Sequence, residues 1–135
     1  MKNVLATILG FISAAFMVYV FETLIGQSLF PLPEGANPMD MEWIKNNMNQ
    51  IPMGSKIFVV IAHFIGIILG MLVAAKISKV SMIPSYIVGA IMLAATFFNI
   101  YVLPKELWFT FSDGILVILG FIIGKSFGMK QLTTE

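Results

Sequence analysis

The chain has 135 residues, of which 59% are hydrophobic and 11% charged, and its formal net charge is +1. So few charges exclude an ordinary soluble domain, and the balanced charge provides no basic field for nucleic acid. All eight basic side chains are lysines, so the bidentate phosphate contacts that arginine makes are excluded. Cysteine does not occur, which excludes disulfides, thiol catalysis and thiolate metal sites.

Four apolar stretches account for most of the sequence, and each is close to the roughly 20 residues that a helix needs to cross a bilayer. The pattern predicts an all-α membrane protein, a four-transmembrane-helix bundle, with residues 1–135 as a single membrane domain. The apolar run after Lys2 is too long for the core of a signal peptide, so we expect it to remain as the first span. The predicted spans are 4–26, 54–77, 84–103 and 105–127.

The longest connection is the segment 27–53, between the first two spans. Prolines near its start disfavour a helix there. Asn37 and Pro38 then form a helix start signal, with asparagine as the N-cap and proline at the first helical position. We expect a short extracytoplasmic helix over 38–49 that lies on the membrane surface or caps the bundle.

The distribution of lysines predicts the orientation, because cytoplasmic loops carry the excess of positive charge. Five lysines fall on the side of the termini and three on the other, which favours both termini in the cytoplasm. We therefore expect a multi-pass protein of a bacterial inner membrane, with the segment 27–53 outside and a polar, frayed tail over 129–135. The two groups are Lys2, Lys76, Lys79, Lys125 and Lys130, and Lys45, Lys56 and Lys105.

Each predicted span contains one polar side chain that is costly in lipid. In chain order these are Glu22, His63, Asn99 and Asp113. A charged group at the bilayer centre costs about 2.5–3.5 kcal/mol on insertion scales, so such groups normally face protein or water. On each predicted helix the polar residue shares a face with small residues, which mark close helix packing. We therefore expect one intramembrane polar cluster in the outer half of the bundle, with Lys56 as a further member.

The predicted face of the first span holds Ala15, Tyr19, Glu22 and Gly26, and that of the fourth holds Glu106, Asp113, Gly120 and Gly124. The Gly66-xxx-Gly70 and Gly120-xxx-Gly124 motifs permit close approach of helices. Their partner is either another helix of the same chain or a second protein, as in a homo-oligomer. The spacing leaves both possibilities open.

The polar cluster has a structural interpretation and a functional one. Glu22 paired with His63 or Lys56 would only hold helices together, and Asn99 would then form an interhelical hydrogen bond. Intramembrane carboxylates otherwise mark functional sites. Asp113 has a further alternative, because Ser-Asp-Gly at 112–114 resembles a turn and could N-cap a shorter last helix. The spacing of the histidine and carboxylates does not indicate a metal site, so we expect no metal and no cofactor.

Size, four spans and a glutamate in the first span are similar to the small multidrug resistance transporters, where an essential glutamate binds proton and drug. That resemblance implies such a role for Glu22, although the segment 27–53 has no counterpart there and the aromatic motifs around that family's glutamate do not occur. Over its whole length the chain resembles a family of small, uncharacterised four-span bacterial inner-membrane proteins. This second resemblance implies the fold and topology, and it supplies no activity. The residues that carry it are Glu22 followed by Pro31-Leu32-Pro33, Pro52-Met53-Gly54, His63 with Gly66, Gly70 and Ala74-Ala75-Lys76, and Asn99 followed by Pro104 and Trp108-Phe109.

The sequence contains no Walker loop, no His-Glu-x-x-His and no Gly-x-Ser-x-Gly motif. We therefore expect a non-enzymatic subunit or accessory protein of a larger membrane assembly. Its expected partners are the lipid bilayer and either further copies of itself or other membrane subunits. The alternative is a small oligomeric proton-coupled transporter that uses Glu22. A third possibility is an enzyme acting on lipid with His63 as general base.

Overall fold

The computed structural model describes residues 1–133, and all the regular structure in this part of the chain is helical. Four helical segments are long and apolar enough to cross a membrane, at 2–29, 53–78, 83–102 and 107–132. The predicted all-α four-helix membrane fold is therefore confirmed. The elements are α1 (Lys2–Tyr19), the π-helix η1 (Val20–Gly26), α2 (Gln27–Leu29), α3 (Met41–Asn46), the 3₁₀ turn η2 (Met48–Gln50), α4 (Met53–Ser78), α5 (Ile83–Val102) and α6 (Leu107–Thr133).

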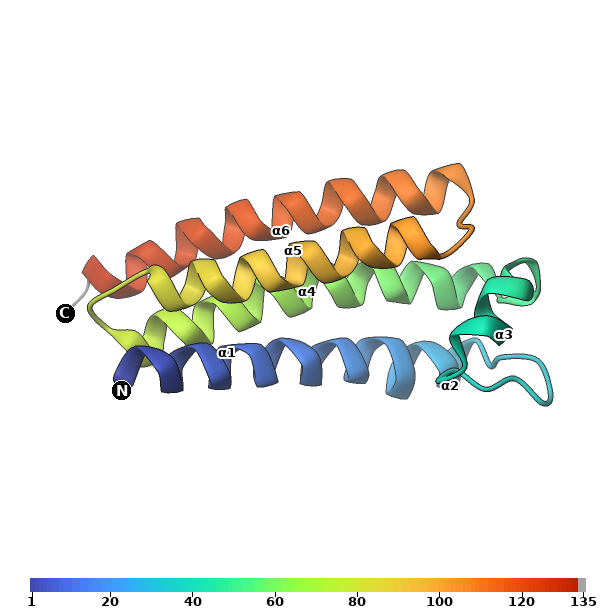
Figure 1. The fold of residues 1–135 in the computed structure, drawn as a ribbon, viewed down its shortest axis with the longest axis horizontal. Coiled ribbons are helices and arrows are strands. Elements are labelled where there is room, and N and C mark those ends of the chain that lie inside the picture. The colour runs from blue at the N-terminus through green and yellow to red at the C-terminus, as the bar shows by residue number, and fades with distance from the viewer. Residues whose placement is uncertain (134–135) are drawn as a thin grey trace.

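The four long helices run side by side along one axis (Figure 1). Helix α4 packs against α1, α5 and α6, and α5 also contacts both α1 and α6. The start of α1 and the last turn of α6 lie at one end of the bundle, with the α4–α5 turn (Figure 1). We call this the terminal end. The opposite end, which carries residues 30–52 and 103–106, is the cap end.

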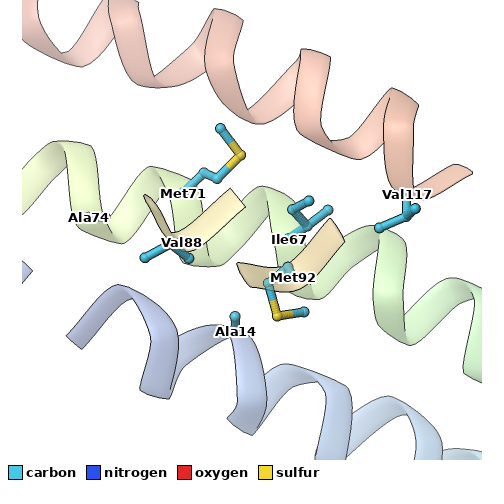
Figure 2. Close-up of a cluster of buried hydrophobic side chains, with 7 residues drawn as sticks. All are labelled: Ala14, Ile67, Met71, Ala74, Val88, Met92 and Val117. Carbon is cyan, nitrogen blue, oxygen red and sulfur yellow. The ribbon is translucent and has the colours of Figure 1, made fainter. Parts of the chain in front are cut away.

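A cluster of buried apolar side chains from all four long helices fills the middle of the bundle (Figure 2). Each member is 6% exposed or less. On every helix these residues lie nearer the terminal end than the polar residue of that helix does, so the cluster separates the polar residues from the terminal end. We call it the apolar core. Its members are Ala14, Ile67, Met71, Ala74, Val88, Met92 and Val117.

Glycines bring the backbones of neighbouring helices together. A Cβ atom at Gly70 would lie 2.7 Å from the Cβ of Ala14 and 2.9 Å from the carbonyl oxygen of Gly10, so α1 and α4 touch at this point. A Cβ at Gly120 would lie 2.5 Å from a methyl carbon of Ile67 on α4. Gly66 faces α1 in the same way, and Gly124 faces α4. Both glycine motifs are thus occupied by contacts within the chain.

Several predicted boundaries are wrong. The first span continues to Leu29, because the chain stays helical until just before the prolines. The short helix begins at Met41, since Asp40 accepts hydrogen bonds from the backbone N–H groups of residues 42 and 43. Asn37 caps only a turn, by accepting from the N–H of Met39. The tail is helical through 133, and the predicted frayed residues 134–135 lie outside the described part.

The predicted face of α1 is also wrong. Ala14, not Ala15, turns toward α4 and is fully buried, whereas Tyr19 is 51% exposed. Small residues at positions 6, 10 and 14 form the buried face instead. The cause is the π-helix η1 that follows Tyr19: a stripe traced back from Glu22 at regular α-helical spacing misses the face that the first part of α1 buries.

Candidate functional site

Asp113 is the centre of a buried polar chain that links two helices. It lies inside α6 and is fully buried. One carboxylate oxygen, Oδ1, is 2.7 Å from Nδ1 of His63 on α4. The other, Oδ2, accepts a hydrogen bond of 2.8 Å from Nζ of Lys105. Asp113 therefore does not N-cap a shorter helix, because its carboxylate is engaged by two side-chain donors inside the bundle.

Lys105 precedes α6 and folds back against its first turns. Its side chain is only 1% exposed, and its ammonium lies 4.2 Å from the centroid of the Phe109 ring, which adds a cation–π attraction. From the sequence, Lys105 contributes only to the lysine count that predicts the orientation. A lysine two helical turns before an aspartate, at a point where the chain re-enters the bundle, was the signal that could have predicted this ion pair.

His63 joins the buried chain to the open space at the cap end. Its side chain is 12% exposed. A carboxylate accepts hydrogen bonds, so Nδ1 carries a proton and donates it to Asp113, while Nε2 lies on the other side of the ring. Nε2 makes no hydrogen bond to any residue of the described chain. The Asp113 carboxylate thus fixes the orientation of the ring and a proton on Nδ1.

A second ion pair closes the cap end of the same region. Lys56 on α4 is 4% exposed and donates to the carboxylate of Glu106, in the connection between α5 and α6. The hydrogen bond from the Lys56 ammonium lowers the pKa of the Glu106 carboxyl below its ordinary value. The predicted pairing of Lys56 with Glu22 is wrong, because Lys56 is engaged by Glu106 instead.

Glu22 lies on the π-helical turn η1. The backbone N–H of Gln27 donates to the carbonyl oxygen of Glu22, five residues earlier, which defines the wider turn. A wider turn contains more residues, so residues four apart lie more nearly above one another than they do in an α-helix. Glu22 therefore stays on the side of the helix that faces α4, with Ala14 and Val18. The same turn places Gly26 against α4, where an added Cβ would lie 2.8 Å from the Cβ of Phe58.

The carboxylate of Glu22 has charged neighbours but no partner. It interacts electrostatically with His63, Lys105 and Asp113. Within the described residues, however, no hydrogen bond or ion pair reaches it, because the histidine and the lysine are both turned to Asp113. The predicted pairing of Glu22 with His63 is therefore wrong. π-Helical turns are rare, and they are frequent at functional sites.

These groups surround one cavity of about 140 Å³ at the cap end. This volume holds several water molecules or a very small solute, and it is below the roughly 300–1,000 Å³ of pockets for drug-sized ligands. Apolar side chains of α3, η2 and α6 line the cavity on its cap-end side, with Met48 and Phe109 nearly buried. The polar side chains that line it are Glu22, Gln27, Ser55, Lys56, His63, Asn99 and Lys105.

Four of the five residues of the predicted cluster thus line one cavity, and Asp113 lies directly behind it. Asn99 makes no side-chain hydrogen bond to another described residue, so the interhelical bond expected for it is not formed in this structure. Its amide faces the cavity instead. No group of three or more histidine or acidic side chains in the described residues could hold a metal ion.

Two of the three carboxyl groups at the site are paired with lysines. Lys105 pairs with Asp113 and Lys56 pairs with Glu106. Glu22 is the carboxyl group of the cavity lining for which the described chain supplies no such partner. Comparisons of the chain with protein-family models, curated proteins and solved structures give no match.

Proposed function

We propose that the protein is a non-enzymatic subunit or accessory protein of a larger membrane assembly, and that it binds a small ligand in the cap-end cavity. The observation that carries this proposal is the contrast between the two halves of the bundle. The polar cavity occupies the cap end, and the apolar core, to which all four long helices contribute, lies between it and the terminal end. Binding at one face fits this arrangement better than passage through a single chain does.

The outer surface of the bundle supports contact with lipid and leaves room for a protein partner. Large apolar side chains are exposed along the long helices, among them Phe16 at 61% and Phe98 at 65%. Because the glycine motifs are used within the chain, a partner would pack on these larger side chains instead.

Extraction of the protein from its native membrane in mild detergent and in polymer-bounded lipid discs tests the assembly, with mass spectrometry of the intact particles. We expect the chain to co-purify in fixed stoichiometry with a further membrane protein or with copies of itself. Phe98→Ala should weaken that association, whereas Phe64→Ala, a change within the chain's own helix contacts, serves as the control for general destabilisation. Recovery of a lone monomer under every mild condition would contradict the proposal.

We further propose a bacterial inner membrane as the location, with both termini in the cytoplasm. Two of the three lysines at the cap end, Lys56 and Lys105, are buried in ion pairs, which leaves Lys45 as the exposed lysine there. The excess of exposed lysines at the terminal end is therefore larger than the excess of all lysines. The positive-inside rule assigns an end with such an excess to the cytoplasm. Reporter fusions at the C-terminus test the orientation: activity of a reporter that works only outside the cytoplasm would contradict it.

The unpartnered carboxylate of Glu22 favours a second candidate, an oligomeric proton-coupled transporter. An intramembrane carboxylate without a partner can exchange a proton with a solute. The apolar core means that the path would have to run between chains or open by a helix movement. Transport by the protein in proteoliposomes should then stop in Glu22→Gln, and unchanged transport in that variant would exclude this candidate.

A further inference from the structure

The cavity contains a repeated arrangement that is incomplete at one position. Three carboxylates lie in or beside it, those of Asp113, Glu106 and Glu22. The first holds the ammonium of Lys105 at 2.8 Å, and the second holds the ammonium of Lys56. Both lysine side chains are almost fully buried. The third carboxylate, Glu22, has no ammonium from the chain.

We propose that Glu22 binds a primary ammonium group supplied by a ligand. This inference rests on the proposed role of the cavity as a binding site at one face, and it names the chemical class of the ligand. An ammonium group from a ligand would give Glu22 the kind of partner that Lys105 gives Asp113 and Lys56 gives Glu106. The same chemistry is already present twice in the site, because the chain itself binds two lysine ammonium groups there.

The other cavity walls suit such a ligand. An alkylammonium group has three N–H donors, and a carboxylate alone does not satisfy them all. Asn99 and Gln27 also line the cavity, and a side-chain amide offers a carbonyl oxygen that can accept a hydrogen bond. Apolar side chains such as Leu32 and Val59 provide contacts for a short alkyl chain. The cavity volume of about 140 Å³ limits the ligand to a few heavy atoms.

A divalent metal ion fits the site less well. Such ions need several anionic or imidazole ligands, and the described residues offer no group of three. A free small amine and the ethanolamine headgroup of a phospholipid both carry the primary ammonium group, and both could reach a cavity at the membrane face.

The test uses the full-length protein in lipid discs of phosphatidylcholine and phosphatidylglycerol, because neither headgroup carries a primary amine. Methylammonium is the probe, and binding is measured with radiolabelled probe by equilibrium dialysis. Since His63 is the only histidine of the chain, a ¹⁵N-histidine NMR signal reports binding next to Glu22 without ambiguity. We expect saturable binding and a shift of the Nε2 signal.

Three comparisons decide the assignment. Glu22→Gln should lower the affinity about 10- to 100-fold, since it removes a hydrogen bond between charged groups, whereas Glu34→Gln, an exposed loop carboxylate, should bind as the unaltered protein does. Glu22→Asp should retain part of the affinity, which separates loss of charge from loss of folding. Tetramethylammonium, which has no N–H donor, should not bind. Equal binding of Na⁺ or K⁺, or unchanged affinity in Glu22→Gln, would overturn the proposal.

Discs that contain phosphatidylethanolamine identify the source. Weaker apparent binding of methylammonium there supports the lipid headgroup as ligand, and unchanged binding supports a free amine. A site that responds only to pH, with no response to methylammonium, would overturn the inference. The proposed function can fail separately: amine binding by a chain that is always monomeric would contradict the accessory role and leave this inference standing.

Discussion

Asp113→Asn should be the most destabilising conservative change in the protein. It removes the charge that compensates Lys105, whose side chain is 1% exposed, and it weakens the acceptor for Nδ1 of His63. Removing one partner of a buried ion pair costs about 3–5 kcal/mol, because the other charge is left buried and uncompensated. Replacing both partners with apolar side chains is often close to neutral. The double variant Asp113→Leu with Lys105→Met should therefore be more stable than Asp113→Asn alone.

Reversible unfolding in mixed micelles measures this prediction. Denaturing detergent is titrated and helicity is followed by circular dichroism for the unaltered protein, the single variants and the double variant. Lys105→Met alone should also destabilise, although less, because His63 still donates to the carboxylate. A free energy of unfolding for Asp113→Asn within about 0.5 kcal/mol of the unaltered protein, the range of an ordinary surface change, would refute the reasoning.

Three further predictions use other parts of the structure. Gly70→Ala should lower the free energy of unfolding by about 1–3 kcal/mol through overpacking, since its Cβ would lie 2.7 Å from the Cβ of Ala14. Gly114→Ala is the control in the same unfolding assay and should be near neutral, because its Cβ would meet nothing closer than 3.7 Å. Because the pKa of Glu106 is lowered in the folded protein, its pairing with Lys56 should stabilise the fold above pH 4.5, the carboxyl's ordinary pKa, and this contribution should be lost as the pH falls through the folded pKa. Glu106→Gln should lack that pH-dependent step, and a step of equal size in the variant would contradict the assignment. For His63, ¹⁵N NMR should show a proton on Nδ1, and a ring protonated only at Nε2 would contradict its hydrogen bond to Asp113.

Periodicity and composition were sufficient to predict the fold and to select the polar residues. Apolar runs long enough to cross a bilayer predicted the four helices. The free-energy cost of a charged group in lipid identified the polar residues of the site, which are Glu22, His63, Asn99 and Asp113. The cap of the short helix was misplaced, since both Asn37 and Asp40 are good N-cap residues and only the local geometry chooses between them.

The pairing within the site could not be predicted, because it depends on how far side chains reach across helices. Lys105 is eight residues from Asp113, and it meets the aspartate only because the chain folds back before α6. The face of α1 depended on the π-helical turn at Glu22, since a single wide turn changes which residues face α4. Regular 3.6-residue periodicity contains no signal for such a turn.

We expect the polar cavity to be reached from the cap end, because the apolar core lies between it and the terminal end. The chain has no cysteine, so single cysteines report accessibility directly. Asn99→Cys should react with a membrane-impermeant maleimide added to the cap-end side of sealed vesicles, and Ala74→Cys in the core should react from neither side. Glu34→Cys and Val80→Cys, exposed at the two ends, identify the sides. Labelling of Asn99→Cys from both sides, or of Ala74→Cys from either, would contradict the account.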